Sequence, residues 1–326
     1  MTPDSDSALR EVASLLRDAT SVVVCSHVNP DGDAVGAVLG AALALRASGV
    51  DAIPTLADEG SAPVNYSFLP GFGLYRAAST LAAPEVFLAL DVPNIDRLGV
   101  ARQLARDAGA IAVIDHHPDN ALFGAANYVD PAAAAVGQMI WRMLPDLDVS
   151  PDPSIASCLY VALMTDTGRF SYGNTDSRAL RVAADMIDAG ANAFRAYSNV
   201  YETRSPAYMR LLGLTLSRIT HANDGRVAYS WITGDDVSST GAMPEEAEDL
   251  VDMVRAVAAV EVVFLLKSQD GHCRMSLRAK GPFDVGAAAR TLGGGGHHAA
   301  AGATVDGGVP EALAALLPLL PGSDRA

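Results

Sequence analysis

Four short apolar runs recur in the amino-terminal part of the chain, with helical stretches between them. Runs of this kind are typical of strands that are buried on both faces. Their alternation with helices predicts a parallel sheet covered by helices on both sides. The expected strands are residues 21–25, 51–56, 86–90 and 110–114, and the expected helices are residues 8–18, 34–48, 133–144 and 153–165.

The second part of the chain follows a different pattern. Two Asp-Gly turns, at residues 223–225 and 269–271, are of the kind that joins antiparallel strands. The pattern predicts an α/β fold in which the parallel-sheet domain is followed by a smaller α/β domain with a mixed sheet. The expected bounds are 1–190 for the first domain, 191–208 for a helical linker and 209–322 for the second domain, whose strands are expected at 226–232, 260–267 and 272–278 and whose helices are expected near 207–218, 245–257 and 284–291.

The charge of the chain constrains its partners. It has 23 basic and 38 acidic residues, a formal net charge of −15, whereas long nucleic acids usually bind broad basic surfaces. The acidic start at residues 1–6 does not resemble an export signal, and the longest apolar run, residues 34–45, is too short to span a bilayer. Three cysteines without metal-ligand spacing indicate reduced thiols. We therefore expect a cytoplasmic protein with a small ligand and no membrane contact.

Acidic and histidine side chains follow the first strand. His27 comes two residues after that strand, and Asp31 and Asp33 lie two apart in the next turn. Gly32 between them lets the backbone turn tightly. One alternative is that Asp33 only caps the helix that begins at Ala34. Capping explains one aspartate but not the whole group, so the pattern favours metal ligands.

Three more groups of the same kind follow along the chain. Asp91 comes directly after the strand at 86–90, and the triplet Asp115-His116-His117 comes after the strand at 110–114. Asp166 lies at a polar break after an apolar helix. Because ligands of parallel sheets bind beyond the carboxyl ends of the strands, these groups are expected to share one crevice.

The combined ligand set indicates which metal would bind. Imidazole nitrogens and carboxylate oxygens without cysteine suit Mn²⁺, with Mg²⁺ or Fe²⁺ as alternatives, better than a structural Zn²⁺. The set exceeds the needs of one ion and fits a pair roughly 3.5–4 Å apart. Such a pair produces hydroxide at neutral pH and neutralises phosphate oxygens, which points to hydrolysis of a phosphate ester.

A run of four glycines, 293–296, precedes His297 in the second domain. It can be read as a flexible hinge, or as a cradle whose N–H groups bind an anion. Ser276 and Arg278 alternate along the preceding strand and so face the same side, where Arg278 could bind a phosphate with two N–H groups. These neighbours favour the cradle, which would comprise Gly294, Gly295 and Gly296 together with His297.

These motifs together resemble the DHH phosphoesterase superfamily, which is named after the triplet found here at residues 115–117. The first motif is matched by His27, Asp31 and Asp33 with Gly36, and the second by Asp91 followed by Arg97-Leu98-Gly99. The third is the triplet with Pro118 and Asn120, and the fourth is residues 166–170. In the second domain, residues 276–278, 293–297 and 300–302 resemble the DHHA1 substrate-binding domain. The resemblance covers nearly the whole chain. Within the superfamily, the chain is similar to the group of nano-RNases, pAp phosphatases and cyclic di-AMP phosphodiesterases.

The resemblance also implies roles for individual residues. One Mn²⁺ would be held by His27, Asp31 and Asp91, and the other by Asp33, Asp91, His116 and Asp166, with Asp91 bridging. The scissile phosphate would contact His117, and Asp115 would orient the histidines from behind. The remote nucleotide would be held by Ser276, Arg278, His297 and the glycines 294–296.

The expected activity is hydrolysis of small nucleotides by a hydroxide that two metal ions activate. Candidate substrates are short oligoribonucleotides, 3′-phosphoadenosine 5′-phosphate, and cyclic di-AMP or its linear product pApA. Alternatives are an inorganic pyrophosphatase or exopolyphosphatase of the same superfamily, and a nucleotide sensor without catalysis. Relatives in this superfamily are often dimers, so a homodimer is a further expectation.

Overall fold

The computed structural model describes residues 5–60 and 62–322. These residues form two compact units that divide between Thr203 and Arg204, within the predicted linker. The bounds predicted for the domains stay predictions. Residues 1–4, which include most of the acidic start, lie outside the described residues. No helix among the described residues is long and apolar enough to cross a bilayer.

The amino-terminal unit is built around a five-stranded sheet in the order β2-β1-β3-β4-β5, and every neighbouring pair is parallel. This confirms the predicted fold and the four predicted strands, and it adds β5 at one edge. Residues 126–129 of β5 have the sequence Ala-Asn-Tyr-Val, which has no continuous apolar run. The strands are β1 (Ser21–Cys25), β2 (Asp51–Pro54), β3 (Val86–Leu90), β4 (Ala110–Asp115) and β5 (Ala126–Val129).

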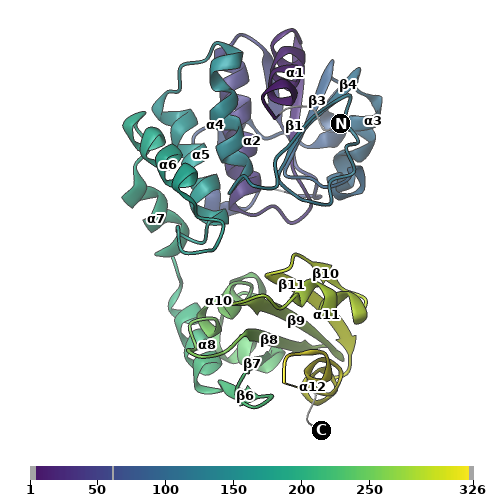
Figure 1. Cartoon of the computed structure of the whole chain (residues 1–326), viewed down its shortest axis with the longest axis vertical. Coiled ribbons are helices and arrows are strands. Elements are labelled where there is room, and N and C mark those ends of the chain that lie inside the picture. Colours follow the sequence, from purple (N-terminus) through teal and green to yellow (C-terminus); the bar gives the residue numbers. More distant parts are fainter. Residues whose placement is uncertain (1–4, 61, 323–326) are drawn as a thin grey trace. The chain divides into compact units, whose positions relative to one another are not determined.

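Helices lie on both faces of this sheet (Figure 1), and apolar side chains form a separate buried cluster on each face. Alternate strand residues point to opposite sides, so Leu88 packs with α1, α2, α4 and α5 while Phe87 packs toward α3. The α-helices are α1 (Ser5–Arg17), α2 (Gly32–Ala47), α3 (Arg102–Asp107), α4 (Val136–Met143), α5 (Pro153–Asp166), α6 (Ser177–Asp188) and α7 (Ala193–Tyr201). Short 3₁₀ helices are η1 (Val64–Tyr66), η2 (Phe72–Leu74), η3 (Ala78–Thr80), η4 (Ile95–Ala101) and η5 (Leu144–Leu147).

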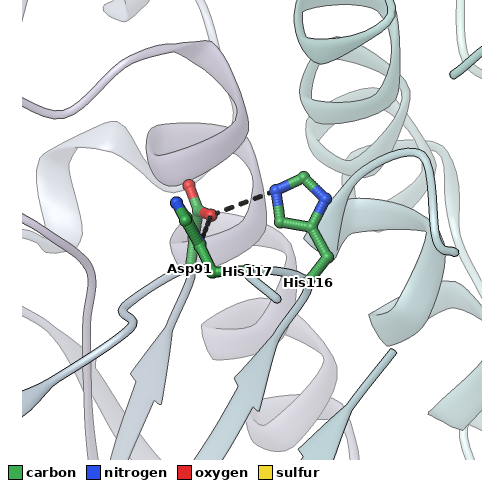
Figure 2. Close-up of side chains that lie close together, drawn as sticks. All are labelled: Asp91, His116 and His117. Carbon is green, nitrogen blue, oxygen red and sulfur yellow. Dashed lines mark ion pairs between the residues drawn. The ribbon is translucent and has the colours of Figure 1, made fainter. Parts of the chain in front are cut away.

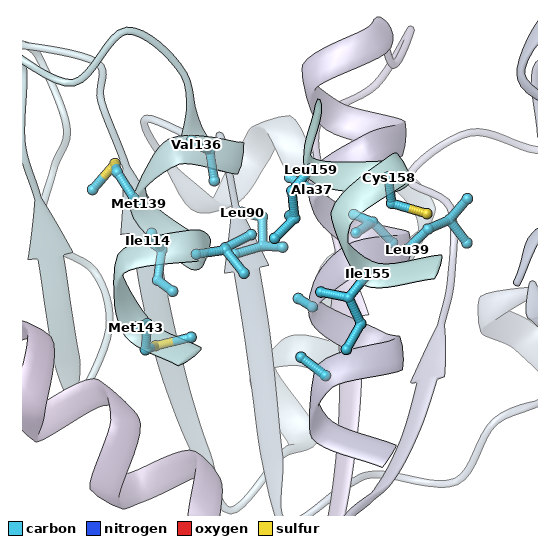
Figure 3. Close-up of a cluster of buried hydrophobic side chains, with 14 of the residues drawn as sticks. Ala37, Leu39, Leu90, Ile114, Val136, Met139, Met143, Ile155, Cys158 and Leu159 are labelled. Carbon is cyan, nitrogen blue, oxygen red and sulfur yellow. The ribbon is translucent and has the colours of Figure 1, made fainter. Parts of the chain in front are cut away.

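The helices α2 and α5 pack closely against each other, and α2 also contacts β3 (Figure 3). A side chain at Gly36 would place its Cβ 2.5 Å from the carbonyl oxygen of Cys158, so only glycine allows this approach. Gly40 makes a similar contact, with its Cβ position 2.4 Å from the side chain of Leu159. This close packing brings the start of α2 beside the end of α5, where Asp33 and Asp166 lie.

The carboxy-terminal unit contains a six-stranded sheet in the order β10-β11-β9-β8-β7-β6. Only β7 and β8 are parallel, which confirms the predicted mixed sheet. One face packs against α8 and α10, and the other packs against α11 and α12 (Figure 1). The strands are β6 (Thr220–Ala222), β7 (Val227–Thr233), β8 (Val262–Gln269), β9 (His272–Ala279), β10 (Gly295–Gly296) and β11 (Ala300–Asp306).

Several elements of this unit were not predicted. The strand β11 begins Ala-Ala-Gly-Ala, whose small side chains give no strand signal. The helix predicted at 245–257 is shorter and consists of a 3₁₀ turn and α10. The helices are α8 (Pro206–Ser217), α9 (Gly234–Thr240), α10 (Leu250–Val254), α11 (Val285–Thr291) and α12 (Val309–Leu316), with 3₁₀ helices η6 (Pro244–Ala247) and η7 (Leu317–Leu319).

Candidate metal centre

The structure brings the histidines and aspartates singled out above together at the carboxyl ends of the central strands. They come from the loops after β1, β3 and β4, from the start of α2 and from the end of α5. Three groups have ligand atoms within 4.8 Å of one another, and they share members. The groups are His27 with Asp31 and Asp91, Asp33 with His116 and Asp166, and Asp91 with His116 and His117.

Asp91 lies at the centre of this arrangement (Figure 2). One carboxylate oxygen, Oδ2, is 3.4 Å from His27 Nε2, and the other, Oδ1, is 3.4 Å from His116 Nε2. The residue is buried, and Oδ1 has no hydrogen-bond partner among the described residues. Its φ of 58° is in the left-handed region, which places the side chain beyond the end of β3. A buried carboxylate between two imidazoles, with one oxygen that lacks a hydrogen-bond partner, is well suited to accept a cation.

Backbone carbonyl groups orient both of these histidines. His27 Nδ1 lies 2.8 Å from the carbonyl oxygen of Val28, and His116 Nδ1 lies 3.2 Å from that of Ala133. A carbonyl accepts only from a protonated nitrogen, so Nδ1 carries the hydrogen in each ring. Each Nε2 therefore points its lone pair toward the carboxylates once the ring is neutral, as in histidines that ligate metals.

The first two aspartates are held by helix starts. The Asp31 side chain accepts a hydrogen bond from Ala34 N and caps α2. The alternative that Asp33 caps this helix is therefore wrong. Asp33 instead accepts from Val136 N at 2.8 Å and Gly137 N at 3.0 Å, at the start of α4. Each carboxylate oxygen keeps a second lone pair, so these bonds leave Asp33 able to bind a cation.

Behind the histidines, Asp115 is fully buried and fixes His117. Its Oδ1 lies 2.7 Å from His117 Nδ1 and also accepts from His116 N at 2.8 Å. Its Oδ2 accepts from Asn120 Nδ2 at 2.6 Å. Asp115 belongs to none of the three donor groups and sets the tautomer of His117, so that a ligand would meet Nε2 of that ring. Asn120, known beforehand only from the resemblance, anchors the loop to Val92 O at 3.0 Å.

The histidines of the centre hold protons strongly. Burial lowers the pKa of His27, but the hydrogen bond and charge of Asp91 outweigh it and raise that pKa to about 9. Burial likewise lowers the pKa of His116, and the surrounding carboxylates, with Asp91 foremost, raise it to about 11. Burial also lowers the pKa of His117, but the hydrogen bond and charge of Asp115 outweigh it and raise that pKa.

The carboxylates show the complementary effect. Burial, together with the charges of neighbouring acids, raises the pKa of Asp33 well above its ordinary value. Burial also raises the pKa of Asp166, to about 7, against the lowering influence of His116. Burial acts on Asp91 in the same direction, but His116 and His27 hold its pKa below the ordinary value. So many acids in one buried place are mutually repulsive, and a cation relieves that repulsion.

In the carboxy-terminal unit, Ser276 and Arg278 are half-buried and lie on the same face of β9. Arg278 donates from Nε to Asp252 at 3.0 Å and from Nη1 to its neighbour Leu277 O at 3.1 Å. At two of the four positions in the glycine run, packing or backbone conformation favours glycine. A Cβ at Gly294 would lie 2.1 Å from Gly302 O, and Gly296 has a φ of 132°. His297 is exposed, and its backbone N–H donates to Ala300 O. Roles in ligand binding for these residues stay predictions.

Comparison with known protein families gives two matches. Residues 21–163 match the model described as "DHH family, N-terminal domain", and residues 224–320 match the model described as "DHHA1 domain". The first match contains β1–β5 and most of the donor groups, and the second contains nearly all of the carboxy-terminal sheet. Both matches occur in the predicted order.

Individual proteins resemble the chain over most of its length. A Thermus thermophilus protein named "Bifunctional oligoribonuclease and PAP phosphatase NrnA" is 34% identical over 303 residues, which is 92% of this chain and 89% of the relative. An exopolyphosphatase-related protein from Bacteroides fragilis has the same fold, with a TM-score of 0.87 at 22% identity and coverage of 97% and 96%. RecJ from Thermus thermophilus in complex with Mn²⁺ is more distant in fold, with a TM-score of 0.55, 18% identity and coverage of 94% and 52%.

Proposed function

Because the chain belongs to the DHH phosphoesterase family, with a DHHA1 domain in its second half, we propose that it hydrolyses short oligoribonucleotides and 3′-phosphoadenosine 5′-phosphate. The similarity to a bifunctional oligoribonuclease and PAP phosphatase along nearly the whole of both chains supports these substrates. The observation that carries the proposal is the set of three overlapping donor groups around the buried Asp91.

The donor set fits a pair of divalent cations, for which we propose Mn²⁺. The unsatisfied Oδ1 of Asp91, the two Nε2 atoms that face the Asp91 carboxylate and the absence of thiols from the three donor groups all suit such ions. One ion would be held by His27, Asp31 and Asp91, and the other by Asp33, Asp91, His116 and Asp166. When bound, the pair would supply a nucleophilic hydroxide at neutral pH and neutralise charge on the phosphate.

Residues of the chain itself would position the substrate phosphate. Asp115 holds His117 by Nδ1 at 2.7 Å, so the Nε2 side of this ring would contact the scissile phosphate. The raised pKa of His117 favours the protonated form of its imidazole, which suits an anionic ligand. Ser276, Arg278, His297 and the glycines 294–296 would hold the remote nucleotide or its terminal phosphate.

The decisive experiment is a substrate panel with added Mn²⁺ and chromatography of the products. The panel contains pApA, an oligoribonucleotide of three residues, 3′-phosphoadenosine 5′-phosphate, cyclic di-AMP, pyrophosphate and polyphosphate. We expect release of mononucleotides from the two linear substrates, and of AMP and phosphate from 3′-phosphoadenosine 5′-phosphate. Turnover of pyrophosphate or polyphosphate alone would contradict the proposal, and so would retention of nucleotide without any product.

Two variants test whether the donor groups carry the activity. Asp33→Asn and His116→Gln remove ligands while preserving side-chain size, and we expect each to lower kcat by roughly 100-fold or more. Asp96→Asn is the matched control, because Asp96 on η4 is an exposed acid that pairs with Arg102 of α3. Circular dichroism of each variant checks the fold. Near-normal turnover in either folded ligand variant would refute the assignment.

A further inference from the structure

Two cations lie directly opposite each other on the carboxy-terminal sheet. Lys267 of β8 is the register partner of Arg274 of β9, so both side chains stand on the same face. Like charges placed in this way repel each other and destabilise a sheet. The chain has only two lysines among its 23 basic residues, which makes a half-buried lysine here the more unusual.

Among the described residues, a single carboxylate pairs with both cations. Glu248 Oε1 lies 2.9 Å from Lys267 Nζ and 3.0 Å from Arg274 Nη1, so a single oxygen serves both cations. Lys267 Nζ is buried, and its contact with Glu248 lies outside regular hydrogen-bond geometry. Burial lowers the pKa of Lys267, with Arg274 and Arg278 acting in the same direction. The three groups together keep a net positive charge.

Lys267 and Arg274 both line a pocket of about 310 Å³ in this unit. That volume is at the small end of the range of about 300–1,000 Å³ typical of ligand pockets. Beside the carboxylate of Glu248, its lining combines the two cations with hydroxyl groups and one imidazole, a donor set that suits a phosphate. These lining residues are Thr233, Lys267, Ser268, His272, Arg274 and Thr304.

The pocket continues the face that carries Ser276 and Arg278. Arg274, Ser276 and Arg278 alternate along β9, and Arg274 and Arg278 are about 13 Å apart along the strand at ~3.4 Å per residue. Gly302 and Ala300 of β11 lie opposite Ser276 and Arg278, so no large side chain of that strand covers this face. The two arginines would therefore meet different phosphates of one extended substrate.

We propose that the pocket around Lys267 and Arg274 binds an additional backbone phosphate of an oligoribonucleotide, beyond the unit that Arg278 holds. The inference rests on the proposed function and deepens it, because it adds a subsite that favours oligomers over dinucleotides. Glu248 pairs with both cations when no phosphate is present and competes with the incoming anion.

The test compares full-length variants on 5′-phosphorylated oligoribonucleotides of two to five residues with Mn²⁺. The readout is kcat/KM for each longer oligomer divided by that for the dinucleotide. We expect Arg274→Gln and Lys267→Gln each to lower this ratio roughly tenfold, because each removes a charged contact made only by longer substrates. Glu248→Gln should raise the ratio, since it removes the competing charge.

Arg226→Gln is the matched control, because Arg226 also forms an ion pair on this unit, with Glu261, but does not line the pocket. Its ratio should equal that of the unaltered protein. A purely structural ion cluster predicts that Glu248→Gln impairs the protein as the other two variants do, and that result would overturn the inference. So would unchanged ratios in Arg274→Gln and Lys267→Gln. If the unaltered protein cleaves no oligoribonucleotide, the proposed function itself fails.

Discussion

At the scale of single residues, the centre depends on which ring nitrogen each histidine presents. The Nδ1 atoms of His27 and His116 face backbone carbonyls, whereas that of His117 faces the carboxylate of Asp115. A carbonyl at Nδ1 fixes the tautomer that presents Nε2 to a metal, whereas a carboxylate at Nδ1 also favours the imidazolium form. The adjacent residues His116 and His117 thus differ in the group that contacts Nδ1, and therefore in the role that each ring can take.

Asp115→Asn tests this division of roles. The amide can keep the size of the carboxylate, but it no longer carries the charge that raises the pKa of His117. We expect kcat to fall roughly 100-fold or more, within the range for a misplaced or wrongly protonated catalytic group. Steady-state kinetics on pApA measures this, and the His117 pKa, followed by NMR in the metal-free protein, should fall.

Asp119→Asn is the control for that substitution, because Asp119 is an exposed acid in the same loop. It should leave both kcat and the His117 pKa unchanged. An Asp115→Asn protein that loses activity while the His117 pKa stays in place would contradict the role assigned to Asp115.

At the scale of elements, the contact between α2 and α5 determines the distance between Asp33 and Asp166. The helices approach closely because Gly36 has no Cβ to meet Cys158 O, at 2.5 Å from where a Cβ would lie. The two aspartates sit at the ends of these helices, so the contact acts on the centre without touching a ligand.

Gly36→Val should therefore damage both stability and metal binding. Overpacking of a tight core contact costs about 1–3 kcal/mol, and the helix ends must separate to relieve the clash. We expect a lower Tm and a weaker affinity for Mn²⁺, measured by thermal unfolding and by isothermal titration. Gly73→Val is the control, because open space surrounds a Cβ there. Unchanged Mn²⁺ affinity in a destabilised Gly36→Val protein would separate the contact from the centre.

The sequence predicts the strands that carry the centre better than those that border it. The runs of β1, β3 and β4 are continuous and apolar because both of their faces are buried, and the donor residues follow them directly. The edge strand β5 and the Ala/Gly-rich β11 lack that signal. The hydrogen bond that the backbone of α4 donates to Asp33 could not be predicted either, since it joins residues 103 positions apart and depends on the tertiary fold.

At the scale of the whole molecule, the two units have separate cores, and the three donor groups lie in the first of them. Each unit also contains one of the two tryptophans, Trp141 in α4 and Trp231 in β7. Substitution of one tryptophan by phenylalanine lets the other report on its own unit. A ligand that binds only the native form of one unit stabilises that unit by mass action.

Mn²⁺ should therefore stabilise the amino-terminal unit, and more so at higher pH. In the metal-free centre the raised pKa values of Asp166, about 7, and His27, about 9, mean that protons occupy the ligands. Groups with raised pKa values stabilise the folded form at low pH, and that contribution is lost as the pH rises through them. Mn²⁺ must displace these protons, so its affinity increases over the same interval.

The stabilisation by Mn²⁺ is measured in a Trp231→Phe protein, in which Trp141 reports on the amino-terminal unit. The shift in Tm on adding Mn²⁺ is compared at pH 6 and at pH 8. At 100 times the Kd, binding contributes about 2.7 kcal/mol, or roughly 5–11 °C for a unit of this size. We expect a larger shift at pH 8. In the Trp141→Phe protein, Trp231 should report no shift, because the three donor groups found among the described residues all lie in the other unit. Equal Tm shifts at the two pH values would show that the ligands are already deprotonated at pH 6. That result would contradict their raised pKa values.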